Sequence, residues 1–214
     1  MQIALIPFCM LIMYSSSCKK DKPTICSKEN TVVLPIDAVN RFFFNDSSYW
    51  IYQDSASGLI DSLWVYETSS GVGNLEKINP SSKGKCFEGF TVKFYSKFYK
   101  YNLNVACVGS PLGTPYEKEE FDVNYIQDNI HCDGFSLKSW NQYEVLDSDY
   151  GKIYHKDSIT INNIQYYNVL INSNIDALGN YIYLESFYAP NIGMIRYKLR
   201  NGSVWNMIRN KLKK

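Results

Sequence analysis

The sequence predicts a mainly β fold, in which an antiparallel sheet curls into a barrel or half barrel and carries one or two short helices. Short runs rich in Tyr, Ile, Val, Phe and Trp recur along the chain at the length of single strands. Turn residues separate these runs, most clearly at Asn162-Asn163 and Asn201-Gly202. Roughly nine or ten strands at short spacing are typical of a sheet that closes or curls on itself.

Residues 1–17 predict a signal peptide. An uncharged segment from Ile3 to Met13, interrupted by Pro7, is too short to cross a bilayer and has the length of a signal-peptide apolar core. Small residues then lead to Cys18, and charged residues begin directly after it. This pattern resembles the lipobox of bacterial lipoproteins. The resemblance implies that the chain is cleaved before Cys18 and that this cysteine carries a lipid anchor whose acyl chains include palmitate. The alternatives are an ordinary secretory peptide or a buried N-terminal strand.

The rest of the chain divides into a tether and one folded part. Residues 18–30 are polar and without periodicity, which predicts a short spacer behind the lipidated cysteine. Residues 31–214 have a size that suits a single β-rich domain. The 22 basic and 21 acidic residues give a net charge of +1, which indicates no nucleic-acid partner. The membrane is expected as a partner through the N-terminal lipid alone.

The folded part begins with a predicted helix over residues 34–43. Pro35 suits its first turn, and Ile36, Val39, Phe42 and Phe43 share one side. Residues 49–53 and 60–66 then predict a hairpin whose loop of four or five residues contains Gly58.

Residues 86–95 and 98–107 predict a second hairpin, with a tight turn at Ser96-Lys97. In this register Cys86 faces Cys107 at a non-hydrogen-bonded position, where the two Cα atoms approach to about 4.5 Å. We therefore expect a Cys86–Cys107 disulfide in an oxidising compartment, with Cys26 and Cys132 as the remaining pair. The register also places two lysines opposite each other, which opposes it.

The segment over residues 117–134 is acidic and shows no clear period, so we expect a surface excursion there. Residues 157–161 and 164–171 predict a hairpin, because Asn at both central turn positions tolerates the positive φ of a type I′ turn.

A meander over residues 181–188, 192–199 and 203–209 closes the chain. The Asn201-Gly202 turn predicts a register that pairs Leu199 with Val204, and Ile195 with Ile208, on one face.

Several of these segments look like the uncharacterised lipoproteins abundant in Bacteroidota. The likeness lies in the signal, in residues 43–52, in the hairpin over residues 161–169, and in residues 188–196 and 201–206. It implies a lipid-anchored β domain in the cell envelope, held at the outer membrane and facing the periplasm or the outside. It implies no particular activity.

Catalytic patterns are thin. His131 and His155 are the two histidines of the chain and do not lie at metal-ligand spacing. No nucleophile-elbow, zinc-protease or phosphate-loop motif occurs, and the many carboxylates have no context that singles out a pair. The sequence therefore assigns no catalytic residue, no metal and no cofactor, and favours a protein that is not an enzyme.

Three functions stay open. The first is a non-enzymatic envelope lipoprotein that binds a protein, a glycan or a small ligand, with aromatic contacts from Trp50, Trp64, Trp140 and Trp205. Two exposed aromatic rings on one face would favour a glycan. The second is a carrier of lipid or lipophilic cargo, which a large apolar cavity would favour. The third and weakest is an envelope hydrolase, which clustered carboxylates or a buried histidine in a cleft would favour.

Overall fold

The structure is a computed structural model that describes residues 26–27, 30–34, 36–74, 86–98, 101–110, 120–127, 130–137, 152–173 and 183–213. For the strands between residues 101 and 137 it describes the backbone and the side chain of Val105. The signal peptide, Cys18 and Trp140 therefore lie outside the described residues.

The described residues form one helix and twelve strands, and the fold class is confirmed: an antiparallel sheet curls into a half-barrel around one short helix. In chain order the elements are β1 (Thr31–Val32), α1 (Ile36–Phe42), β2 (Tyr49–Asp54), β3 (Ile60–Asn74), β4 (Cys86–Ser96), β5 (Tyr101–Ser110), β6 (Glu120–Gln127), β7 (Ile130–Leu137), β8 (Lys152–Ile161), β9 (Ile164–Ser173), β10 (Tyr183–Ala189), β11 (Gly193–Leu199) and β12 (Val204–Lys211).

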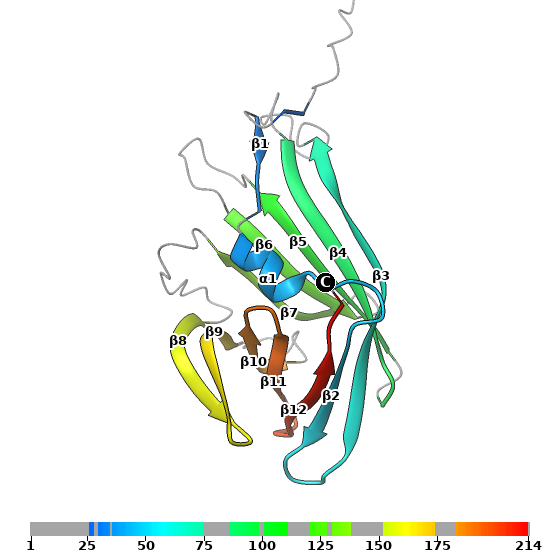
Figure 1. The fold of residues 1–214 in the computed structure, drawn as a ribbon, viewed down its shortest axis with the longest axis vertical. Helices are drawn as coiled ribbons and strands as arrows, with labels where there is room; N and C mark the ends of the chain where they lie inside the picture. Colours follow the sequence, from blue (N-terminus) through cyan, green and yellow to red (C-terminus); the bar gives the residue numbers. More distant parts are fainter. Residues whose placement is uncertain are drawn as a thin grey trace, which may run out of the picture.

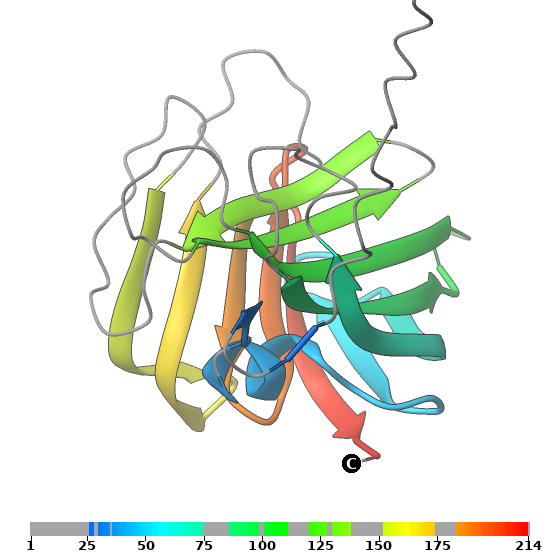
Figure 2. The same ribbon diagram turned by 90° about the horizontal axis from the view of Figure 1, so that it is seen from above.

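The strand order brings the two halves of the chain together in the middle of the sheet. Hydrogen-bonded neighbours follow the path β7-β6-β5-β4-β3-β2-β12-β11-β10-β9-β8, and β1 pairs with β4 in parallel. The antiparallel pair of β2 and β12 joins the halves. The two arms curve toward each other, with α1 lying inside the curve and contacting both β11 and β5 (Figures 1 and 2).

Helix α1 begins two residues later than predicted. Phe42 is buried and Val39 and Phe43 pack against the core, as expected, but Ile36 is 71% exposed, so its place on the apolar side is wrong. Residues at i, i+3 and i+4 from Ala38 turn inward and carry Arg41 to its acceptors on β9 and β10.

Two hairpins follow the prediction because their turns are specified locally. Asn162 and Asn163 have φ of 50° and 64°, and Ile161 pairs directly with Ile164. Gln53 pairs with Ile60 across a loop in which the Asp54 carboxylate accepts hydrogen bonds from the Ser57 amide at 2.9 Å and from the Ser57 hydroxyl.

The predicted register of β4 and β5 is wrong by four residues. Phe90 faces Cys107, and Lys93 faces Asn104. The longer connection separates Lys93 from the lysine that the tight turn would have placed opposite it, and frees it to pair with Glu67 at 2.7 Å. Because the shift is an even number of residues, the apolar face of each strand is unchanged.

The disulfide joins Cys86 to Cys26, so the expected Cys86–Cys107 pairing and the Cys26–Cys132 pairing are wrong. Strand β1 runs beside β4, where the Cys86 amide donates to the Asn30 carbonyl at 2.7 Å. This parallel contact brings the two Cα atoms to 5.7 Å, which is within disulfide range. The side chains of Cys107 and Cys132 lie outside the described ones.

The expected surface excursion over residues 117–134 is also wrong. Strands β6 and β7 form a hairpin there and extend the sheet from β5. The alternation of Phe121, Val123 and Tyr125 with polar residues is short, but it becomes a strand once β5 supplies a partner.

The register of β11 and β12 differs by one residue from the prediction. Tyr197 pairs with Trp205, and Gly202 adopts a φ of 87° in a three-residue turn, where its amide donates to the Leu199 carbonyl at 3.0 Å. A shift of one residue reverses the faces of a strand. Trp205 and Met207 therefore enter the core, while Ile208 is 43% exposed.

Candidate ligand-binding site on the outer face of the sheet

Three aromatic side chains and a lysine form a row across four adjacent strands. Lys211 on β12 pairs with Tyr49 on β2, Tyr49 with Trp64 on β3, and Trp64 with Tyr95 on β4. Residues paired in this way project from the same face of a sheet. The row lies on the outer face, since the next residue along each of β2 and β3 and the residue before Tyr95 are buried in the core.

Two rings of this row stack on each other. Tyr49 and Trp64 stack with ring centroids 4.8 Å apart and planes inclined by 28°. Trp64 is 43% exposed and Tyr95 is 40% exposed. The row therefore presents two exposed aromatic side chains on one outer face.

A bulge in β3 adds a fourth ring. The register shifts between Val65 and Glu67, so Tyr66 and Glu67 both project outward, and Tyr66 is 48% exposed. Beside it the Lys93 ammonium donates to the Glu67 carboxylate at 2.7 Å, and this hydrogen bond raises the pKa of Lys93. We call Tyr49, Trp64, Tyr66 and Tyr95 the aromatic platform.

Positive charge borders the platform on the β12 side. The Arg209 guanidinium lies 5.7 Å from the centroid of the Tyr49 ring, and Lys211 is exposed at the end of the row. The platform therefore combines exposed aromatic side chains, which can contact the C–H groups of a sugar, with donors at its edge for hydroxyl or carboxylate oxygens.

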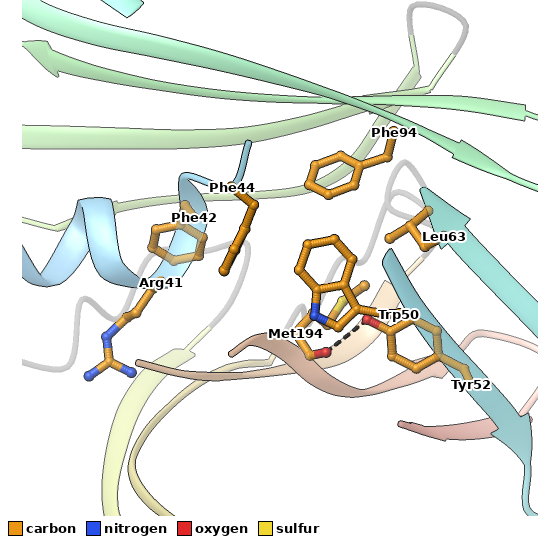
Figure 3. A pocket seen from close by; sticks show the side chains of 8 residues that line it. All are labelled: Arg41, Phe42, Phe44, Trp50, Tyr52, Leu63, Phe94 and Met194. Atoms are coloured by element: carbon orange, nitrogen blue, oxygen red, sulfur yellow. Dashed lines mark hydrogen bonds between the residues drawn. The ribbon is translucent and has the colours of Figure 1, made fainter. Parts of the chain in front are cut away.

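The inner face of the half-barrel is filled by side chains in the part that the structure describes. Trp50 and Trp205 are buried there, and the Trp50 indole donates to the Ile192 carbonyl at 2.6 Å. Figure 3 shows Trp50 between Phe44 and Phe94, with the Tyr52 hydroxyl bonded to the Met194 carbonyl at 2.8 Å. The cavity among these residues is about 10 Å³, enough for about one water molecule, and gives no support to a lipid cargo.

A buried arginine fixes α1 against the inner side of β9 and β10. Arg41 is fully buried and donates to the carbonyls of Asn168 at 2.7 Å and Tyr188 at 2.9 Å, and to the Asn168 side-chain oxygen at 2.9 Å. Asn168 has a φ of 53°, and its side-chain oxygen also contacts His155 Nε2. The cluster positions the helix and holds Asn168 in a left-handed conformation.

Within the described ranges, no three or more His, Cys, Asp or Glu side chains gather where they could hold a metal ion. In the same ranges, no helix has both the length and the apolar character that a bilayer span requires.

The predicted tryptophans separate into different environments. Trp64 lies on the outer platform, Trp50 and Trp205 lie in the core, and Trp140 falls outside the described residues. The sequence reasoning missed Tyr49, Tyr66 and Tyr95. A loop of four residues, one of the two lengths expected for the first hairpin, places Tyr49 opposite Trp64.

Comparison of the chain with models of protein families, with curated proteins and with solved structures finds no match.

Proposed function

We propose that this protein is a non-enzymatic lipoprotein of the cell envelope, held at the outer membrane by lipid on Cys18, and that its aromatic platform binds a glycan. The observation that carries the proposed binding is the stacked pair of Tyr49 and Trp64 within a row of aromatic residues on one outer face.

The size of the platform favours a glycan over a stable protein partner. Trp64, Tyr66 and Tyr95 are 43%, 48% and 40% exposed. Since an aromatic side chain covers about 150–250 Å² when fully buried, these three offer together about 300 Å². A stable protein interface needs about 800 Å² on each partner, more than these three side chains offer.

The binding test uses the full-length lipoprotein, extracted from membranes in detergent. Its retardation in native gels that contain β-glucan, xylan, hyaluronan or polygalacturonate reports binding. We expect retardation by at least one polysaccharide, and a loss of about 1–2 kcal/mol of binding free energy, or about tenfold in Kd, in Trp64→Ala. The matched control is Tyr167→Ala, because Tyr167 is 64% exposed on the β8–β9 hairpin and away from the platform.

Retardation by none of the polysaccharides, or equal effects of Trp64→Ala and Tyr167→Ala, would refute platform binding. The anchoring half of the proposal is tested separately by metabolic palmitate labelling of the wild type beside Cys18→Ala. Label that is lost in Cys18→Ala supports the anchor, and label on neither or on both contradicts it. Protease accessibility on intact cells then reports which side of the outer membrane the domain faces.

A further inference from the structure

A second cavity lies at the end of α1, at the border of the core. Its volume is about 250 Å³, slightly below the usual range for small-ligand pockets of about 300–1,000 Å³. The cavity is lined by Asn40 of α1, by Phe43 directly after this helix, and by Asn45 from the segment before β2. Its other wall consists of Asn191 from the β10–β11 turn and of Leu212 and Lys213 after β12.

Main-chain hydrogen bonds hold these segments together. The Asn191 amide donates to the Asn40 carbonyl at 2.7 Å, and Asn191 has a φ of 60° that this position requires. The Asn45 amide donates to the Lys213 carbonyl at 3.4 Å, and the Lys213 amide donates to the Ser48 hydroxyl at 2.9 Å. The walls of the cavity are thus joined through backbone atoms, which leaves its side chains available.

Three carboxamides line this cavity. Among the described residues, the side chains of Asn40, Asn45 and Asn191 make no hydrogen bond to another protein group; Asn40 and Asn45 are partly buried and Asn191 is exposed. Each carboxamide offers two donors and an acceptor oxygen. Partly buried amides arranged around one space suit a ligand that carries several hydroxyl or carboxylate oxygens.

The charge of the lining indicates which polar ligand fits. Lys213 lines the cavity, and no Asp or Glu is among the described residues that line it. An ammonium beside carboxamide donors favours a carboxylate over a neutral group, while Phe43 and Leu212 provide an apolar wall for a ring face. We propose that this cavity binds a single acidic sugar ring of the hexuronate class.

The C-terminal segment of the chain connects the cavity to the aromatic platform. Lys211 ends both β12 and the platform row, and Lys213, two residues later in the chain, lines the cavity. An acidic glycan would then place one ring in the cavity and the following rings over Tyr49 and Trp64. The ligand class rests on the proposed function, but the cavity itself is independent of the platform.

The test uses saturation-transfer NMR on the full-length protein in detergent, with D-glucuronate and D-glucose as the probes. We expect a stronger signal from glucuronate, at least fivefold weaker binding in Asn40→Ala and in Asn191→Gly, and loss of the preference over glucose in Lys213→Met. Glycine keeps the positive φ of position 191 without strain, so Asn191→Gly removes the amide and preserves the turn.

Each further outcome decides between the cavity and the platform. No signal from glucuronate, or a signal that Asn40→Ala and Asn191→Gly leave unchanged, overturns the cavity. Equal signals from both sugars, unaffected by Lys213→Met, overturn the acidic ligand class. Trp64→Ala is expected to leave monosaccharide binding intact while weakening polysaccharide binding, so failure of the platform alone would appear only in the polysaccharide assay.

Discussion

The disulfide between Cys26 and Cys86 is expected to be a large part of the stability of this domain. The two cysteines are 60 residues apart, and the chain-entropy relation for a loop of this length gives about 4 kcal/mol at 25 °C. Cys26 is exposed, so its side chain adds little packing of its own, whereas Cys86 is fully buried. The double variant Cys26→Ser with Cys86→Ala should therefore lose mainly the cross-link, at a cost of about 2–4 kcal/mol.

Urea unfolding of the wild type and the double variant measures this difference, and peptide mapping identifies the bond. Trypsin without reductant should release residues 21–28 joined to residues 86–93, because the bond after Lys22 precedes proline. The single variant Cys18→Ala is the control, since it removes a cysteine that lies outside this bond. A change in the free energy of unfolding below about 0.5 kcal/mol, or a peptide that links Cys86 to Cys107 or Cys132, would refute the reasoning.

Three further predictions concern single positions. Gly193→Ala should destabilise the protein by about 2–4 kcal/mol in urea unfolding, because a Cβ at this φ of 85° would lie 2.9 Å from the Phe44 ring. The control Gly202→Ala has a similar φ of 87° but nothing within 4 Å of the added Cβ, so it should cost only about 1–2 kcal/mol. Equal losses of stability in the two variants would contradict the contact with Phe44. Arg41→Met should cost roughly 3–5 kcal/mol in the same assay, because it removes the donor of three hydrogen bonds to oxygens of Asn168 and Tyr188. A loss of stability below about 1 kcal/mol would refute the role of Arg41 in holding α1. The hydrogen bonds from Ser57 lower the pKa of Asp54, so Ser57→Ala should raise that pKa in a carboxyl NMR titration. The stability that this interaction contributes is present above about pH 4 and is lost as the pH falls through the folded-state pKa of Asp54. An unchanged Asp54 pKa in Ser57→Ala would contradict the assignment.

The outer platform shows where sequence reasoning stops. Tyr49 and Trp64 belong to one hairpin, so their pairing follows from a local loop. Tyr95 and Lys211 reach the row only because β4 and β12 pair with the two sides of that hairpin. The strand order that brings residues 49 and 211 together depends on the collective packing of the sheet, which no short segment encodes.

The sequence by itself determined the fold class, the alternation of buried and more exposed residues along β2 and along β4 from Phe90 on, and the turns at Asn162-Asn163 and at Gly58. These features depend on the φ preferences of a few residues and on the two-residue period of a strand, so each is specified within about ten residues. Only the tertiary structure decided the registers of β4 with β5 and of β11 with β12, the Cys26–Cys86 bond, and the entry of Trp205 into the core. Cross-strand pairs differ by only about 0.2–1 kcal/mol, so the burial of large side chains across the whole half-barrel overrides the local choice of partner.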